Sequence, residues 1–303
     1  MGGPPRHTAG GQAPGPTCYL IDGSSYLYRA FHALPPLTTS RGVPSNAVLG
    51  FAGMLLKIVR ERRPDYLGVA FDGPGPTVRH HAFAEYKAQR PPMPEPLALQ
   101  VPLVHRVVEA LRVPLLMVEG EEADDILATL AAAARDGGAH AVIITGDKDL
   151  LQVVGDGISV YDPMRDKWYD RGEVEARYGV PPEALVDLFG LTGDAIDNVP
   201  GVPGVGEKTA RALLQEFGSL DRLLNEVARV GRPKLREALA AHAEQARRSR
   251  ELVRVRRDVA VPVDLEGLRR RPPAAEAFLA LCRELELNRL QAAFAQGDLL
   301  GRA

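Results

Sequence analysis

Acidic residues recur where apolar runs end and where helical patterns begin. Asp22 and Asp72 each directly follow an apolar run, and Asp147 lies one glycine beyond another. The stretch VEGEEADD (118–125) carries five carboxylates at the start of a helical pattern, more than helix capping and the helix dipole explain. The acids that we expect to converge are Asp22, Asp72, Glu122, Asp124, Asp125, Asp147, Asp149, Asp194 and Asp197.

Carboxylates gathered in a partly buried cleft repel one another, so cations must neutralise them. Ligation by oxygen alone selects Mg²⁺ or Mn²⁺ over zinc. Two such ions roughly 4 Å apart can activate a water and stabilise the attacking and leaving oxygens of a phosphodiester. Singly, each acid has a plainer explanation: a helix cap, an ion cluster around Lys148, or a turn at GDAIDN (193–198). Their joint placement predicts a two-metal hydrolase.

The elements that must position these acids are four short apolar runs with helical patterns between them. The runs are 18–21, 66–71, 114–118 and 141–145, and the clearest helical patterns are 47–61 and 126–138. Alternating strands and helices predict an α/β fold with a central, mostly parallel sheet flanked by helices. The carboxyl ends of such strands form the edge where α/β folds bind ligands, so the acids should meet there.

Residues 73–96 interrupt this alternation of strands and helices with Gly and Pro around a polar stretch. The insertion is long enough to be an arch over the active site. We expect its cations and its tyrosine to grip phosphates and stack a base, with a further cation after the first acidic strand end. These residues are Arg79, Tyr86, Lys87, Arg90 and Arg29. His80 and His81 have no partner at ligand spacing and are expected to be exposed polar residues.

A second motif, GVPGVGEKTARALLQEFG (201–218), combines glycines with a following helix. It is not a phosphate-binding P-loop, because Glu207 stands at the lysine position and no strand precedes it. Exposed backbone N–H groups there suit a helix-hairpin-helix that holds a DNA phosphate, and a structural turn between helices is the alternative. The residues concerned are Gly201, Gly204, Gly206, Lys208 and Thr209. For the basic run 247–257, a solvated helix face and a DNA-backbone contact remain equally open.

The composition is that of a soluble globular protein. The formal net charge of −2 gives no overall attraction to nucleic acid, so DNA binding must depend on local charge. Cys18 and Cys282 suggest neither a disulfide framework nor zinc, which fits a reducing cytoplasm. No apolar run is long enough to span a membrane. We expect a disordered tail at 1–16, a nuclease domain at 17–172 with its arch, a helical module at 173–260 and a C-terminal helical segment at 261–303 packing back on the nuclease domain.

Several long motifs in one order resemble the 5′ nuclease domain of bacterial DNA polymerase I, within the flap endonuclease superfamily. The resemblance covers roughly 17–295 and is carried by LIDGSSYLYRAFHALPPLTTSRG, VAFDG, EYKAQRPPMP, EEADDILATLA, TGDKDLLQV, LTGDAIDNVPGVPGVGEKTA and ALLQEFGSL. It implies a Mg²⁺-dependent 5′-to-3′ exonuclease and 5′-flap endonuclease of replication and repair, which leaves a 5′-phosphate and a 3′-hydroxyl. Its substrates would be DNA with 5′ ends or flaps, with RNA–DNA hybrids as a further class.

The resemblance also implies residue roles. Asp22, Asp72, Glu122 and Asp124 would serve one metal with Asp125 nearby, and Asp147, Asp149, Asp194 and Asp197 the other. Lys87 and Arg90 match arch cations that contact the scissile phosphate, and Tyr86 and Arg29 match substrate-positioning residues. Glycines 201, 204 and 206 match a helix-3-turn-helix hairpin that binds K⁺ in relatives.

Gly73 and Pro74 depart from the family pattern and remove one potential basic contact at the base of the arch. A monomer is the default expectation. The chain ends before any polymerase region, which leaves open an excised domain or a stand-alone nuclease working with a polymerase in trans. Two rivals are a two-metal phosphomonoesterase or RNase, and a DNA-structure-binding protein without catalysis.

Overall fold

The computed structural model describes residues 15–296. The tail expected at 1–16 thus lies almost wholly outside the described residues, as do the last seven residues of the expected C-terminal segment. The strands are β1 (Thr17–Asp22), β2 (Tyr66–Ala70), β3 (Leu115–Leu116), β4 (His140–Ile144), β5 (Ile158–Asp162) and β6 (Lys167–Tyr169).

These strands form one six-stranded sheet with the order β3-β2-β1-β4-β5-β6. Every neighbouring pair is parallel except β5 and β6. The expected α/β class with a mostly parallel sheet is therefore confirmed. The run at 114–118 yields only the two-residue β3, and β5 and β6 were not predicted.

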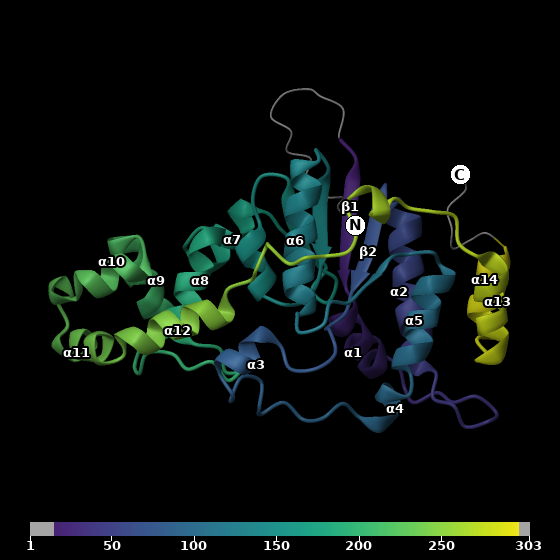
Figure 1. The fold of residues 1–303 in the computed structure, drawn as a ribbon, viewed down its shortest axis with the longest axis horizontal. Helices are drawn as coiled ribbons and strands as arrows, with labels where there is room; N and C mark the ends of the chain where they lie inside the picture. The colour runs from purple at the N-terminus through teal and green to yellow at the C-terminus, as the bar shows by residue number, and fades with distance from the viewer. Residues whose placement is uncertain (1–14, 297–303) are drawn as a thin grey trace.

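Helices lie on both sides of the sheet (Figure 1). In the first half they are α1 (Gly23–Ala33), α2 (Asn46–Arg62), α3 (Val78–Ala82), α4 (Glu95–Ala98), α5 (Val101–Ala110) and α6 (Ala123–Asp136). In the second half they are α7 (Arg171–Tyr178), α8 (Leu185–Thr192), α9 (Glu207–Phe217), α10 (Leu220–Asn225), α11 (Pro233–Ala241), α12 (Ala243–Val253), α13 (Ala275–Glu284) and α14 (Asn288–Ala295). Helix α6 lies on one side of the sheet, and α2 and α5 lie on the other (Figure 1).

The core explains why the strands are apolar throughout. Alternate residues of β1 point to opposite faces, so Leu20 packs in the cluster that contains Ile126 of α6, and Ile21 packs in the cluster that contains Phe51 of α2. Both residues are fully buried. A parallel strand covered on both faces needs apolar residues at every position, which is the pattern of the run 18–21.

The helical second half extends away from the sheet, with α7 to α12 on the side of α6 (Figure 1). Helices α13 and α14 lie at the opposite end, where α13 packs on α5. The arch segment contains the short helix α3, which lies between the sheet and the helical module. None of the helices described between residues 15 and 296 combines the length and apolar character needed to cross a membrane.

Candidate active site

The central strands hold three of the acids through a short hydrogen-bond relay. Asp22 ends β1 and caps α1, accepting from the Ser25 amide at 2.8 Å through one oxygen and from the Thr145 hydroxyl at 2.7 Å through the other. The Thr145 hydroxyl in turn accepts from the Asp147 amide, and Asp147 accepts from the Asp149 amide at 2.8 Å. The strand ends therefore place Asp22, Asp147 and Asp149 in one connected group.

The start of α6 brings the next acids to the same edge. Asp72, beyond β2, accepts from the Ala123 amide at 3.0 Å, so it satisfies the first turn of α6. Glu122 is the N-cap residue of this helix and is buried, while Asp124 is half-buried in the first turn. Asp124 repels Asp147 and Asp22 strongly enough to affect its protonation, so the two groups of acids share one electrostatic site.

The loop after α8 supplies the last two acids. Asp194 accepts from the Ile196 amide at 2.8 Å and forms an ion pair with Lys148 at 2.8 Å. Asp197 is buried and receives Arg90 at 2.6 Å. Lys148, which the sequence suggested only as part of a surface ion cluster, thus joins the loop to the Asp147–Asp149 turn.

The close packing of these acids changes their pKa values. Burial, with added repulsion from Asp72 and Asp147, raises the pKa of Asp22 to about 7. Burial and the neighbouring carboxylates also raise the pKa of Asp124, Asp147 and Asp149. Asp194 is the exception: although burial opposes it, the hydrogen bond and charge of Lys148 lower its pKa. The site therefore holds more negative charge than its own cations neutralise.

These residues fit divalent cations by their chemistry. The donors are all oxygen, their mutual repulsion calls for added positive charge, and one buried oxygen of Asp149 has no hydrogen-bond partner. Among residues 15–296, no group of three or more His, Cys, Asp or Glu side chains is placed so that it could hold a metal ion as it stands. The ligand assignment thus stays a prediction based on donor type and charge.

The arch lies directly on the carboxylates. Lys87 donates to Glu122 at 2.6 Å, and its backbone amide donates to the Asp197 carbonyl at 2.9 Å. The Tyr86 hydroxyl lies 3.1 Å from a Glu122 oxygen and 3.0 Å from an Asp197 oxygen, so its one proton is shared between the two carboxylates. Although burial opposes it, the charges of Glu122 and Asp197 raise the pKa of Lys87, which keeps it a cation. Lys87, Tyr86 and Arg90 thus join the arch to Glu122 at the start of α6 and to Asp197 in the loop after α8.

Three expectations for the arch differ from the structure. The ring of Tyr86 is only 3% exposed, so it is not free to stack on a base. Arg79 is buried and all its donors contact protein atoms, so it is not available to a phosphate. His80 is half-buried, since it accepts from the Thr77 amide at 3.1 Å and packs edge-on against Tyr86, whereas His81 is exposed as expected.

Asp125 also differs from its expected place among the metal ligands. Both of its oxygens accept hydrogen bonds from Arg79, at 2.6 and 2.8 Å, and one also accepts from the Arg256 amide at 2.8 Å. The side chain is 1% exposed and points into this pair. The spacing of three from Glu122 correctly put both acids on one face of α6, but it could not reveal the buried arginine that takes one of them.

The remaining predicted DNA contacts are spread over two regions. Arg29 is half-buried and donates to the Pro163 carbonyl at 2.8 Å, while its other terminal nitrogen has no partner. Gly206 caps α9, and a side-chain carbon added at Gly204 or Gly206 would meet nothing within 4 Å. Gly204 has a φ of +79°, a conformation that favours glycine. The hairpin backbone is thus open to approach from outside.

Around this hairpin, Lys208 is exposed and Thr209 is half-buried. Gly201 lies inside the turn, since an added side-chain carbon would lie 2.2 Å from the Thr192 carbonyl oxygen. Helix α12 holds the same turn, because Gln245 donates to the Gly201 carbonyl at 2.7 Å. DNA contact by these residues remains a prediction.

Thr145 is the functional residue that sequence reasoning missed. It is buried at the end of the run 141–145 and orients both Asp22 and Asp147. Its position directly before the Gly-Asp pair was the available signal, because a hydroxyl at a strand end can support an adjacent carboxylate.

Family comparison covers nearly the whole chain. Residues 17–179 match the family described as "5′-3′ exonuclease, N-terminal resolvase-like domain", and residues 180–276 match "5′-3′ exonuclease, C-terminal SAM fold". The chain is 39% identical over 274 residues to a 5′-3′ exonuclease of Aquifex aeolicus, covering 90% of this chain and 93% of that protein. It is 46% identical over 277 residues to DNA polymerase I of Pseudomonas aeruginosa, covering 89% of this chain and 30% of that protein. The chain thus spans about 30% of the length of such polymerases.

Solved structures show the same fold. A T5 5′-exonuclease with bound zinc has a TM-score of 0.65 at 20% identity, covering 92% of this chain and 98% of that one. The catalytic core of Rad2 in complex with DNA has a TM-score of 0.61 at 16% identity, covering 89% of this chain and 88% of that one. At these identities the likeness concerns the fold alone.

Proposed function

Because the chain belongs to the 5′-3′ exonuclease family, we propose that it is a structure-specific nuclease that cuts DNA at 5′ ends and 5′ flaps. One observation carries the proposal: arch cations and sheet-edge carboxylates meet, with Lys87 at 2.6 Å from Glu122 and Arg90 at 2.6 Å from Asp197. Hydrolysis of a phosphodiester needs cations at the non-bridging oxygens and acids that hold the catalytic metal. Both are present at one edge of the sheet.

The family resemblance divides the carboxylates into two groups. Asp22, Asp72, Glu122 and Asp124 would hold one divalent cation, and Asp147, Asp149, Asp194 and Asp197 a second. Mg²⁺ is the proposed metal and Mn²⁺ its substitute, since the donors are all oxygen. When bound, such ions would help to form the attacking hydroxide and would stabilise the leaving oxygen. Cleavage would leave a 5′-phosphate and a 3′-hydroxyl.

The chain's own residues position the substrate. Lys87 and Arg90 would bind the scissile phosphate, Tyr86 would orient Glu122 and Asp197 through its hydroxyl, and Arg29 would contact the DNA near Asp22. The open backbone around Gly204 and Gly206, with Lys208 beside it, would hold the duplex by its phosphates without reading sequence. K⁺ at this hairpin remains part of the proposal.

Two rivals are weaker. A phosphomonoesterase or RNase on this sheet would need the acids, but neither the cationic arch nor the hairpin. A binding protein without catalysis would not need the crowded carboxylates, whose burial is unfavourable in the absence of bound cations. We further propose a monomer that acts in the cytoplasm, accepts RNA–DNA hybrids as well, and works beside a polymerase joined to it or acting in trans.

The first test is cleavage of a 3′-labelled 5′-flap duplex in Mg²⁺. Wild type should cut at the flap junction, and EDTA or Asp147→Ala should abolish cutting while flap binding is kept. Asp136→Ala is the matched control, because this exposed acid lies at the far end of α6. Wild-type protein that binds the flap tightly but never cuts it would favour the binding-protein rival. Unchanged cleavage by Asp147→Ala would refute the assignment of the acids.

A further inference from the structure

The base of the arch is bound to α6 by a buried ion pair that the proposed chemistry does not use. We propose that Asp125 is not a metal ligand but a positioning residue: with Arg79 and the segment after α12, it fixes the arch so that Lys87 reaches the reacting phosphate. The inference rests on the proposed nuclease function and assigns to the Arg79–Asp125 pair a role in arranging that site.

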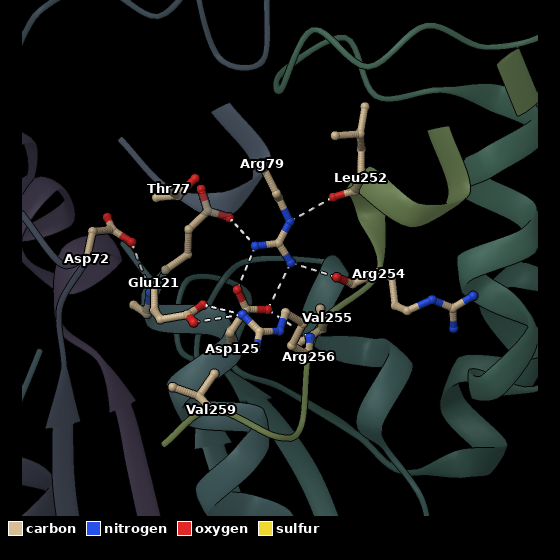
Figure 2. Close-up of polar contacts among 12 residues, drawn as sticks. Asp72, Thr77, Arg79, Glu121, Asp125, Leu252, Arg254, Val255, Arg256 and Val259 are labelled. Atoms are coloured by element: carbon tan, nitrogen blue, oxygen red, sulfur yellow. Dashed lines mark hydrogen bonds and ion pairs between the residues drawn. The ribbon is translucent and has the colours of Figure 1, made fainter. Parts of the chain in front are cut away.

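The pair is geometrically complete. Figure 2 shows the Arg79 guanidinium between Asp125 below and two backbone carbonyls at its side. Nη1 donates to Asp125 at 2.6 Å and to Glu122 at 2.7 Å, and Nη2 donates to Asp125 at 2.8 Å. A guanidinium has five N–H groups, and the two carbonyls take the remaining two. Arg79 therefore has no donor left for DNA, and Asp125 has no oxygen aimed at the acidic site.

The last turn of α12 and the segment after it close the pair from the other side. The carbonyls of Leu252 and Arg254 accept from Arg79 at 2.8 and 2.6 Å, and the Arg256 amide donates to Asp125 (Figure 2). The Arg256 side chain then forms a two-bond ion pair with Glu121, at 2.7 and 2.8 Å. Three parts of the chain that are far apart in sequence thus meet at one buried guanidinium: the arch, the start of α6, and the end of the helical module.

The pair acts on the site through Glu122. This carboxylate receives Arg79 on one oxygen and Lys87 on the other, so one residue links the base of the arch to its reactive cation. The Arg79 carbonyl also accepts from the Phe83 amide, which ends α3 and directs the chain towards Lys87. Loss of the Asp125 charge would leave Arg79 buried with part of its charge unmatched, and the arch base would shift.

Neighbouring acids allow a matched test. Asp124→Asn and Asp125→Asn make the same change in the first turn of α6, one at a proposed metal ligand and one at the proposed anchor. Three quantities would be measured for each folded variant: the Mn²⁺ isotherm by calorimetry, the single-turnover flap-cleavage rate at saturating Mg²⁺, and tryptic cutting of the Lys87–Ala88 bond. Asp124→Asn should weaken Mn²⁺ binding and leave the arch protected.

Asp125→Asn should keep the wild-type Mn²⁺ isotherm, expose the Lys87–Ala88 bond, and slow cleavage by about 10²-fold, the cost of a small misplacement of a catalytic group. If Asp125→Asn does not fold, Arg79→Lys keeps the charge but loses the two-bond fork and should show the same changes to a smaller degree. A weakened Mn²⁺ isotherm in Asp125→Asn, or wild-type rate and protection in either folded variant, would overturn the proposal. If wild type itself fails to cut flaps, the nuclease proposal falls, whereas the isotherms and protection pattern still decide the role of Asp125.

Discussion

Replacing Asp22 with Asn should stabilise the metal-free protein while it abolishes cleavage. The Asp22 side chain is only 5% exposed, and burial with repulsion from Asp72 and Asp147 raises its pKa to about 7 from an ordinary 3.8. Asparagine keeps the hydrogen bond to the Ser25 amide, since it caps helices about as well as aspartate. The Thr145 hydroxyl can reverse its role and accept from the new amide group.

The size of the effect follows from proton linkage. Because the folded state holds this proton at pH values where the unfolded state has lost it, the free energy of unfolding falls as the pH rises from about 4 to about 7. At roughly 1.4 kcal/mol per pKa unit, the Asp22 charge lowers stability above pH 7 by about 4 kcal/mol at most. Asp22→Asn removes this loss, so the variant should be more stable than wild type by a few kcal/mol at pH 8.

Urea unfolding in EDTA at pH 5 and pH 8 measures this difference. Trp168 is the single tryptophan of the chain and stacks on Tyr161 between β5 and β6, so its fluorescence reports on the sheet. The advantage of Asp22→Asn should be large at pH 8 and small at pH 5, and Asp136→Asn, an exposed acid, should show neither effect. If Asp22→Asn is equally or less stable than wild type at pH 8, the argument that this carboxylate is strained by burial and repulsion is wrong.

Lys87→Ala should slow single-turnover cleavage about 10²- to 10³-fold with little change in flap affinity, because the cation acts on charge that develops during the reaction. An unchanged rate beside a weaker dissociation constant would contradict this. Gly201→Ala, whose new carbon meets the Thr192 carbonyl, should unfold more easily by about 1–3 kcal/mol and bind flaps less tightly. Gly231→Ala has open space outside the hairpin and serves as its control in the same melting and binding assays. Lys208→Ala should remove about one phosphate contact, so the slope of log affinity against log salt concentration for flap binding should fall by about one. The cleavage rate at saturating protein should stay unchanged.

The part of the fold that the sequence predicts is the part determined by local periodicity. Buried parallel strands need apolar residues on both faces, and the runs at 18–21 and 141–145 show this without any knowledge of their partners. Strand β6 has only three residues and exists through pairing with β5, for example between Tyr169 and Val160. Such a strand has no period to detect, so the antiparallel edge could not be predicted from the sequence.

The candidate site, like the fold, has a part that the sequence predicts and a part that it does not. Strand ends and a helix start predict which acids gather, because backbone geometry alone brings them to one edge. Sequence spacing does not predict which acid receives a partner from elsewhere in the chain. Asp124 and Asp125 are adjacent and alike in sequence, yet Asp125 faces Arg79, 46 positions away, while Asp124 faces other carboxylates. Only tertiary packing separates the proposed metal ligand from the proposed anchor here.

The basic run 247–257 shows why a count of cations overestimates DNA contact. Arg250 pairs with Asp221 at 2.7 Å, Arg254 with Glu251 at 2.9 Å, and Arg256 with Glu121 at 2.7 Å. Whatever such pairs add to stability, each one neutralises a charge that the sequence alone would offer to phosphate. With the run largely neutralised in this way, a chain of net charge −2 must attract DNA through cations that face the arch and the hairpin. Salt dependence of binding should therefore respond to Lys208 and hardly to Arg254, so Arg254→Ala is the natural control for Lys208→Ala.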